Sequence, residues 1–464
     1  MMGPSRKTTR EGGSFRDPCG FVFWRDGVVY RQVALIYQQH YDHLMSSGLY
    51  KALVEAGLLI THTEVGSESV SAESTYKCLK PEPVPFISYP YEWSFSQYRD
   101  AALTTLRIQK MALDHGMVLK DCSAYNVQFV NGKPVFIDTL SFEKYVEGEP
   151  WVAYRQYCQH FLAPLALMSL KDIRLSQLMR VHLDGIPLDL VSELLPFRTR
   201  FKFSILSHIH LHARSQQYFS DKRVRKNRHR VSRLALLGIV DSLESAVKGL
   251  AWQPKGTEWA EYYSDTNYSE EAFEEKKEVV RRFLEEIRPR DVWDLGGNTG
   301  IFSRVASTQG IPTVSFDVDP AAVEKNYREC RRNNEAKLLP LVMDLTNPSP
   351  DIGWQNEERM SLIERGPADT VLALALVHHL AISNNVPFSM IACFLASMCE
   401  SAIVEFIPKT DSQVQRLLAS REDMFPDYHE AAFEREFSQY FTLSKRVRLT
   451  GSERTIHVMK RKPL

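Results

Sequence analysis

The decapeptide at residues 291–300, Asp-Val-Trp-Asp-Leu-Gly-Gly-Asn-Thr-Gly, decides the fold of this chain. An apolar run ends in the carboxylate of Asp294, a glycine-rich turn follows, and a helical pattern begins at Ile301. Glycine lets the backbone adopt positive φ and lets a ligand approach main-chain N–H groups. The N-terminus of the helix beyond adds partial positive charge. The stretch therefore predicts a nucleotide-like ligand at the carboxyl end of a parallel strand.

Further apolar runs follow, and each is interpreted as a strand that ends in polar side chains: residues 311–316 at Asp317, residues 338–343 at Asp344, and residues 368–376 near His378 and His379. Asp317 lies roughly twenty residues after Asp294, where a mononucleotide-binding βαβ unit carries its ribose-binding acid. Asp319-Pro320 then begins a helix with an N-cap acid and a proline at the first helical position. Strands that alternate with helices predict an α/β fold with a doubly wound sheet.

Residues of about 255 to 464 resemble a class I S-adenosylmethionine (SAM)-dependent methyltransferase with a Rossmann-like sheet. The glycine motif of that family, acid-x-Gly-x-Gly-x-Gly, falls here on Asp294, Gly296, Asn298 and Gly300. Asn298 replaces the middle glycine, and Gly297 stands beside it. Asparagine tolerates left-handed backbone better than most residues, so the motif is kept in substance.

The resemblance implies SAM as the cofactor. Asp294 and Gly296 would lie against its methionine part, Asp317 would bind the ribose hydroxyls, and Asp344 would bind the adenine amino group. The rest of the cofactor-binding turn would be Gly297, Asn298 and Gly300. A nicotinamide dinucleotide is the rival ligand, but its G-x-G-x-x-G pattern is only partly present. The acid before the first glycine favours SAM.

Methyl transfer from SAM is an in-line displacement in which the protein mainly positions the reactants. An oxygen or nitrogen nucleophile that carries a proton needs a base, and His379, followed by His378, is the predicted one. The alternative is that one histidine caps a turn and the other packs. Neither an Asn/Asp-Pro-Pro-Tyr motif nor a cysteine follows residues 368–376. We therefore expect an oxygen or nitrogen on a small-molecule or sugar-like acceptor.

The first half of the chain carries a second signal, which resembles the catalytic loop of kinase-like phosphotransferases. Asn126 follows five residues after Asp121, and a hairpin with an Asn131-Gly132 turn leads to Asp138. In that family the first aspartate orients the acceptor hydroxyl, while the asparagine and the second aspartate hold Mg²⁺. The glycine-rich phosphate loop and the V-A-I-K strand are missing, and Thr139-Leu140 follows where Phe-Gly is typical.

We predict an α+β kinase-like domain here that lends substrate recognition, with no metal bound. The alternative is a Mg-ATP phosphotransferase or a bifunctional enzyme, in which Asp121 is active and Asn126 and Asp138 are the metal ligands. A hairpin whose polar side chains make only local hydrogen bonds is the third possibility.

The whole chain is similar to a family of bacterial two-part proteins, SAM-dependent methyltransferases related to nodulation proteins. The similarity is carried by residues 91–95, 119–121, 136–142 and 376–380. The predicted organisation is a disordered N-terminus at 1–16, the kinase-like domain at 17–215, a basic and helical connector at 216–254, and the methyltransferase domain at 255–464.

Composition limits the partners. The formal net charge is zero, so the chain as a whole does not attract nucleic acid or anionic membranes. No apolar run is long enough to span a bilayer, and the seven cysteines include no C-x-x-C pair. We expect a cytoplasmic protein without disulfides, with a small molecule as its substrate. The basic run at 222–230 is interpreted as a solvated linker rather than a nucleic-acid site.

Two other features bear on the site. Aromatic residues precede the first strand of the methyltransferase-like region and are candidates to cover the cofactor: Trp259, Tyr262, Tyr263 and Tyr268. Glu405 lies inside the apolar run at 404–408. A buried carboxylate needs a partner, so Glu405 is a candidate for the substrate pocket.

Overall fold

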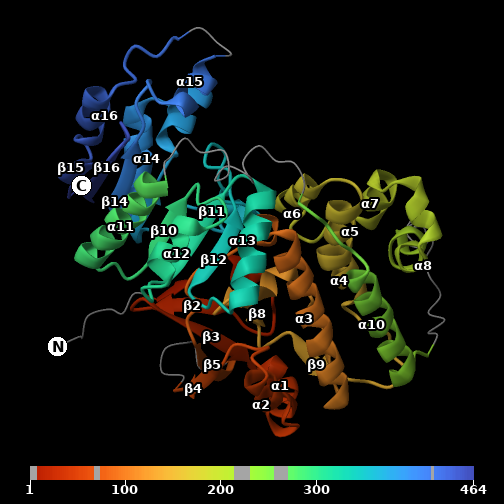
Figure 1. Ribbon diagram of the computed structural model, residues 1–464. Helices are drawn as coiled ribbons and strands as arrows, with labels where there is room; N and C mark the ends of the chain where they lie inside the picture. The colour runs from red at the N-terminus through yellow and green to blue at the C-terminus, as the bar shows by residue number, and fades with distance from the viewer. Residues whose placement is uncertain (1–7, 67–73, 214–229, 255–269, 420–422, 464) are drawn as a thin grey trace, which may run out of the picture. The chain divides into compact units, whose positions relative to one another are not determined.

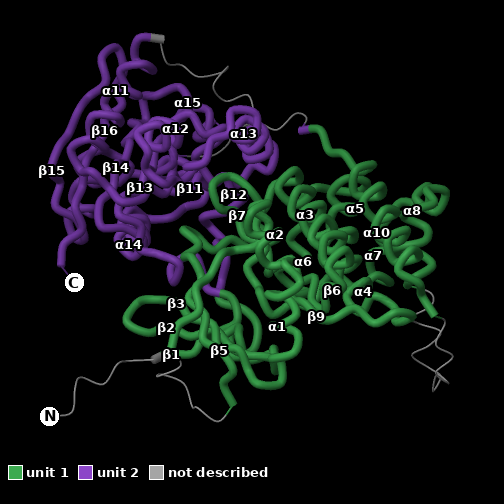
Figure 2. The backbone as a smooth tube through the Cα atoms, turned by 90° about the horizontal axis from the view of Figure 1, so that it is seen from below, with its two compact units in different colours: residues 1–253, 351–359 green, residues 254–350, 360–464 purple. Residues whose placement is uncertain are grey.

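The computed structural model describes residues 8–66, 74–213, 230–254, 270–419 and 423–463. The chain divides into two compact units, residues 1–253 with 351–359 and residues 254–350 with 360–464 (Figure 2). Within the described residues no helix combines the length and the apolar composition needed to cross a membrane. All seven cysteines are free thiols.

Unit 2 contains a seven-stranded sheet in the order β12-β11-β10-β13-β14-β16-β15. Five strands are parallel: β10 (Val292–Leu295), β11 (Thr313–Asp317), β12 (Leu338–Val342), β13 (Ala368–Ala373) and β14 (Cys399–Phe406). The hairpin of β15 (Phe441–Arg448) and β16 (Thr455–Arg461) joins β14 in antiparallel register. The order reverses at β10, which places a topological switch point between β10 and β13. The structure thus has the predicted α/β class, with a mainly parallel sheet.

Helices connect these strands and form the layers of unit 2 (Figure 1). They are α11 (Glu270–Ile287), α12 (Ile301–Ser307), α13 (Pro320–Asn333), α14 (Phe388–Met398), α15 (Ser412–Leu418) and α16 (Glu430–Phe437). Helix α11 packs against α12 and α14 packs against α16. A hydrophobic core forms where the apolar face of α11, including Val280 and Leu284, meets β10 and β13. Burial of this face fixes α11 against the sheet.

Unit 1 begins with a five-stranded antiparallel sheet in the order β1-β2-β3-β5-β4. Its strands are β1 (Thr8–Arg10), β2 (Val22–Arg25), β3 (Val28–Ala34), β4 (His62–Val65) and β5 (Thr75–Pro81), with α1 (Gln38–Ser46) and α2 (Leu49–Glu55) between β3 and β4. Helix α3 (Phe95–Asp114) follows, and its N-terminus is fixed by a capping box between Ser94 and Gln97. The expected hairpin is present as β7 (Val127–Val130) and β8 (Lys133–Phe136).

The rest of unit 1 is mostly helical. Strand β6 (Met117–Leu119) pairs with β9 (Phe142–Lys144), and the helices after them are α4 (Tyr154–Tyr157), α5 (Ala163–Leu170), α6 (Leu178–Val181), α7 (Leu188–Leu194), α8 (Phe203–Ile205) and α10 (Arg233–Lys248). The unit is α+β, as predicted for this region. Its kinase-like identity stays a prediction.

The structure corrects the expected N-terminal disorder for residues 8–16. These residues form β1, which pairs with β2, and a 3₁₀ turn at Gly12–Phe15. Side chains hold them in place, because the Arg10 guanidinium lies 4.5 Å from the centre of the Phe21 ring and the Trp24 indole donates to Glu11. The prediction of disorder relied on polar composition, which carries no information about this strand pairing or these side-chain contacts. Residues 1–7 lie outside the described part of the chain.

The connector at 216–254 also differs from its prediction. Helix α10 belongs to unit 1 and packs on α3, where the Lys110 ammonium lies 2.6 Å from Asp241 and 2.5 Å from Glu244. The apolar face of α10, with Val240 and Leu243 buried, explains this packing. Residues 222–229 of the basic run lie outside the described residues.

Residues 351–359 were expected in the methyltransferase-like domain but belong to unit 1. The Arg16 guanidinium makes two hydrogen bonds to Glu358, at 3.0 and 2.8 Å, and Arg359 lies 4.3 Å from the centre of the Tyr125 ring. A paired arginine fork is one of the stronger polar contacts in proteins. The chain leaves unit 2 after β12, forms this segment of unit 1, and returns to unit 2 before β13.

Candidate cofactor site

The glycine turn between β10 and α12 approaches its neighbours too closely for side chains. A Cβ atom on Gly297 would lie 2.3 Å from the Ser315 hydroxyl and 3.0 Å from an Asp294 carboxylate oxygen. Gly296 has φ +77°, and Asn298 has φ +49°, the left-handed conformation that asparagine tolerates. The turn therefore has the geometry that the motif predicted, with Asn298 in place of glycine.

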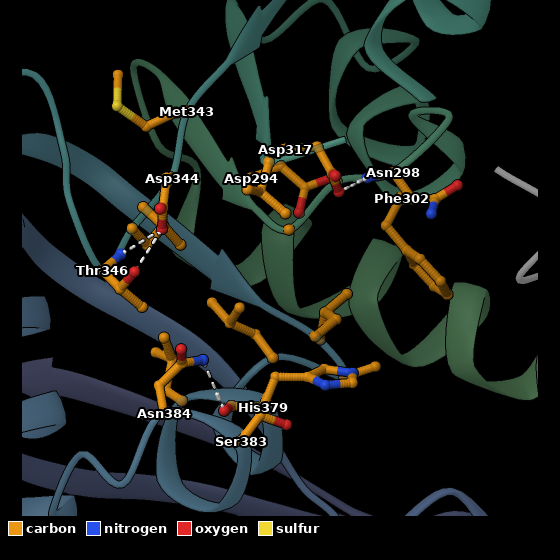
Figure 3. A pocket seen from close by; sticks show the side chains of 18 of the residues that line it. Asp294, Asn298, Phe302, Asp317, Met343, Asp344, Thr346, His379, Ser383 and Asn384 are labelled. Atoms are coloured by element: carbon orange, nitrogen blue, oxygen red, sulfur yellow. Dashed lines mark hydrogen bonds between the residues drawn. The ribbon is translucent and has the colours of Figure 1, made fainter. Parts of the chain in front are cut away.

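Asp294 and Asp317 lie at the carboxyl ends of the adjacent strands β10 and β11, and both line the same cavity. Ser303 donates a hydrogen bond of 2.6 Å to Asp294. Asp317 accepts from the backbone N–H group of Asn298 at 2.8 Å (Figure 3). It also accepts from the backbone N–H group of Asp319 at 2.8 Å. Burial raises the pKa of each carboxyl to about 6. Because both side chains are buried, their charges are strong features of this cavity.

Asp344 follows β12 and completes a row of three carboxylates on successive strands. The backbone N–H and the hydroxyl of Thr346 both donate to one of its oxygens, at 2.8 and 2.7 Å. The other carboxylate oxygen takes no part in these bonds. Asp344 also lines the cavity, so three strand ends deliver acids to one place (Figure 3).

The cavity has a volume of about 330 Å³ and lies at the switch point of the sheet. Its lining includes the predicted residues Asp294, Gly296, Gly297, Asn298, Asp317, Asp344 and His379. Gly300 and His378 are not among the residues that line it. Apolar side chains, among them Phe302 and Leu376, supply the remaining walls. A mostly apolar pocket with a few placed polar groups is typical of a small-molecule site.

The two histidines after β13 differ in position. His379 lines the cavity, and burial lowers its pKa to about 4, so its imidazole is neutral at neutral pH. His378 is buried, and neither ring nitrogen has a hydrogen-bond partner within the described chain. Burial, with His379, Arg454 and Lys276 nearby, holds the pKa of His378 well below its usual range. Of the two, only His379 lines the cavity.

Lys276 on α11 is a cavity residue that the sequence analysis did not identify. Its ammonium lies 2.7 Å from Glu405 and 4.5 Å from the centre of the Phe302 ring. Glu405 also accepts from the backbone N–H of Ala375 at 2.7 Å. The expected partner of Glu405 is thus Lys276, and Lys276 rather than Glu405 faces the cavity. Its spacing in the sequence could have identified it. Lys276 lies three residues after Phe273 and four before Val280, which places it on the apolar stripe of α11.

Unit 1 brings Asp121, Asn126 and Asp138 together. Asn126 and Asp138 both bond to the Ser141 hydroxyl, at 3.3 and 2.6 Å. Asp121 accepts from Gln156 at 2.8 Å, and its pKa is raised first by burial and then by the charge of Asp138. The Arg31 guanidinium lies 3.0 Å from Asp138. A protein cation therefore already pairs with the predicted metal ligand.

The predicted aromatic cover at Trp259, Tyr262, Tyr263 and Tyr268 lies outside the described residues.

Comparison with known proteins finds one long sequence similarity. The chain is 35% identical over 472 residues to nodulation protein NoeA of Rhizobium meliloti strain 1021, and the match covers 99% of this chain and 98% of that protein. No protein-family model matches.

Two similar solved structures each match less than half of this chain. Magnesium protoporphyrin IX methyltransferase from Synechocystis PCC 6803, solved with bound SAH, is 17% identical, has a TM-score of 0.32, and is matched over 43% of this chain and 91% of its own. A TehB-like SAM-dependent methyltransferase from Corynebacterium glutamicum is 15% identical, with a TM-score of 0.26 and coverage of 39% and 87%. The strand order and the residues of the cavity, described above, carry the fold assignment for this chain.

Proposed function

We propose that this chain, which belongs to the family of the nodulation protein NoeA, is a SAM-dependent methyltransferase. The observation that carries the proposal is the convergence of Asp294, Asp317 and Asp344 with the glycine turn on one cavity. Successive strands of a doubly wound sheet present these groups in the order in which a nucleoside-like ligand would meet them.

The residues of the cavity fit SAM. Asp317, beside the turn, would accept from ribose hydroxyls, and the oxygen of Asp344 that does not bond to Thr346 would accept from the adenine amino group. Asp294 and the glycine turn line the part of the cavity in which the methionine part would lie. Bound SAM supplies a methyl group on a sulfonium, which is electrophilic without help from the protein.

The protein's own contribution is positioning and proton handling. The carboxylates and the turn would fix the ligand against the apolar walls of the cavity. His379 is neutral and lies in the cavity, so it can accept the proton of an oxygen or nitrogen nucleophile. A pKa of about 4 makes it a weak base, so positioning is the larger contribution.

The proposed acceptor is an oxygen or nitrogen of a small-molecule or sugar-like compound. The segment after β13 reads Leu374-Ala375-Leu376-Val377, which offers no group for covalent attack on a pyrimidine. Ser383 and Asn384 give the cavity wall neutral polar groups that suit hydroxyl-bearing ligands.

Equilibrium binding to four ligands tests the proposal: SAM, its demethylated product SAH, NAD⁺, and ATP with Mg²⁺. We expect the full chain to bind SAM and SAH in the micromolar range and to bind NAD⁺ much more weakly. Binding of NAD⁺ in preference to SAM, or no binding of SAM by folded protein, would overturn it.

A second candidate function is Mg²⁺-dependent phosphotransfer in unit 1. It is favoured by the meeting of Asp121, Asn126 and Asp138 beside the β7–β8 hairpin. It is disfavoured by Arg31, whose guanidinium lies 3.0 Å from an Asp138 carboxylate oxygen and would compete with a metal for that carboxylate. Release of ADP from Mg-ATP by the wild-type chain, lost on Asp138→Asn, would establish it. Without that activity, unit 1 is assigned to substrate recognition.

A further inference from the structure

A second polar cluster in unit 2 lies between helix α16 and the β15–β16 hairpin. Glu430 and Glu434 are one turn apart on α16, and His457 lies on β16. The His457 Nε2 atom is 3.4 Å from Glu430 Oε1, and its Nδ1 atom is 3.9 Å from Glu434 Oε1. One possible ligand atom from each residue lies within 4.8 Å of the others. None of the three residues lines the cofactor cavity.

The histidine of this cluster is buried without a hydrogen bond. The side chain of His457 is 0% exposed, and within the described residues neither ring nitrogen has a hydrogen-bond partner. Glu430 Oε1, the atom that faces it, lacks one as well. Buried polar groups normally have a hydrogen-bond partner, because leaving them unpaired is costly. The Phe433 ring, with its centre 5.1 Å from that of His457, packs beside the imidazole.

We propose that Glu430, Glu434 and His457 bind a divalent transition-metal ion of the Zn²⁺ class. Zinc binds histidine nitrogen and carboxylate oxygen at about 2.0–2.2 Å. Ligand atoms around a tetrahedral ion are therefore about 3.4 Å apart. The separations of 3.4 and 3.9 Å involve different nitrogens of His457, and one ion binds only one of the two. With one ligand atom from each residue the three atoms lie within 4.8 Å of one another. Side-chain movements of about 1.4 Å or less would bring them to the tetrahedral spacing. One imidazole with two carboxylates suits Zn²⁺, Co²⁺ or Mn²⁺ better than Ca²⁺ or Mg²⁺, which prefer oxygen ligands alone.

Both carboxylates are open to solvent on one side, since the side chains of Glu430 and Glu434 are 29% and 32% exposed. An ion can enter from that side and keep water as its remaining ligand. The site would join α16 to the hairpin that closes the sheet, and it would be separate from methyl transfer.

Arg446 is the competing cation. It lies opposite His457 on β15, with Nη2 2.8 Å from Glu430 Oε2 and Nη1 3.5 Å from Glu434 Oε1. Its side chain is 54% exposed, so it can release Glu434 to a metal while it keeps the outer oxygen of Glu430. The position of Arg446 allows a metal site to be distinguished from an ion-pair network by experiment. If the three residues form a metal site, removal of Arg446 should strengthen metal binding, whereas in an ion-pair network it should not.

The experiment is a calorimetric titration of chelator-treated full-length protein with Zn²⁺, together with the visible spectrum of the Co²⁺ form. We expect one ion per chain, at least about tenfold weaker binding in Glu434→Gln and His457→Gln, and tighter binding in Arg446→Gln. The matched control is Glu274→Gln with Glu278→Gln, a carboxylate pair at the same spacing on α11 beside Lys277 and Arg281. This double variant should leave the affinity for Zn²⁺ unchanged.

Three results would overturn the proposal: no Zn²⁺ bound by the folded wild type, unchanged affinity in both ligand variants, or weaker binding in Arg446→Gln. If His457→Gln does not fold, Glu434→Gln and the Co²⁺ spectrum still decide. SAM binding by the same samples should be unaffected, so the outcome is independent of the proposed methyltransferase.

Discussion

Two clusters of acidic residues in this molecule were predicted from short motifs, and their surroundings differ. In unit 2 the partners of Asp294 and Asp317 are a hydroxyl and backbone N–H groups, and both carboxylates line a cavity. In unit 1 Asp138 is paired with the cation of Arg31 and capped by Ser141. Spacing in the sequence brings carboxylates together in both places. Neutral partners keep the charge available to a ligand, whereas a cation neutralises it.

The largest effect on stability is expected at Lys276, the buried cation on the wall of the cavity. Lys276→Met would leave Glu405, which is 0% exposed, without its main counter-charge. Breaking such a buried pair costs about 3–5 kcal/mol. Urea unfolding of unit 2 would measure the loss. The control Lys277→Met, at the more exposed neighbour that pairs with Glu274, should cost less than about 1 kcal/mol. Equal losses of unfolding free energy in the two variants would contradict the burial of the Lys276–Glu405 pair.

The next effect tests the close packing of the glycine turn. Gly297→Ala places a methyl group 2.3 Å from Ser315 Oγ and should destabilise unit 2 by about 1–3 kcal/mol while weakening SAM binding. Gly238→Ala is the control, because a Cβ atom there meets nothing within 4 Å on helix α10. The control should stabilise the chain by about 0.5–1 kcal/mol. Wild-type SAM affinity in Gly297→Ala would show that the ligand does not use this turn.

Removal of the Arg31 cation from the acidic cluster of unit 1 tests the difference between the two clusters directly. Arg31→Met deprives Asp17 and Asp138 of a shared partner at 2.7 and 3.0 Å, and should cost about 1–3 kcal/mol of stability. Because the two clusters share no partners, the SAM dissociation constant should stay within about twofold of wild type. Thermal unfolding and calorimetry on one sample give both numbers. Strong loss of SAM binding without loss of stability would reverse the roles given to the two clusters.

The last prediction is a dependence of stability on pH. Burial raises the pKa of Asp294 and Asp317 from an ordinary value of 3.8 to about 6, so the folded state holds their protons more tightly than the unfolded state. The stability that these two groups contribute is present below pH 4 and falls as the pH rises towards 6.

The affinity for SAM should change with pH in the opposite direction and increase as the pH rises. If SAM needs the ionised form of Asp317, its affinity should fall about tenfold per unit below pH 6. Calorimetry at pH 5 and pH 7 measures this change, and Asp317→Asn should reduce it. Tighter binding at pH 5 than at pH 7 in the wild type would contradict the role of the carboxylate.

The sequence predicted the strand ends well for a physical reason. Carboxyl ends of parallel strands meet at one edge of a sheet, so Asp294, Asp317 and Asp344 had to lie near each other once the strands were recognised. The presence of Asn298 in place of the middle glycine could also be interpreted from the sequence, because asparagine tolerates the left-handed backbone found there.

Other parts of the site depend on contacts that no local pattern shows. The Lys276–Glu405 pair joins residues 129 positions apart, and a lysine on an apolar helix stripe does not name its partner. His378 and His379 are adjacent in sequence, yet only the fold decides that His379 lines the cavity. The docking of residues 351–359 in unit 1 depends on Arg16, which composition alone assigned to a disordered segment.

The central claim, a SAM site built on strand-end carboxylates, is tested most directly by calorimetric titration of three proteins with SAM. They are the wild type, Asp317→Asn, and Asp369→Asn, whose carboxylate pairs with Arg290 and does not line the cavity. We predict micromolar binding by the wild type and by Asp369→Asn, and at least about tenfold weaker binding by Asp317→Asn. Equal affinity in all three proteins, or no binding by the folded wild type, would contradict the account.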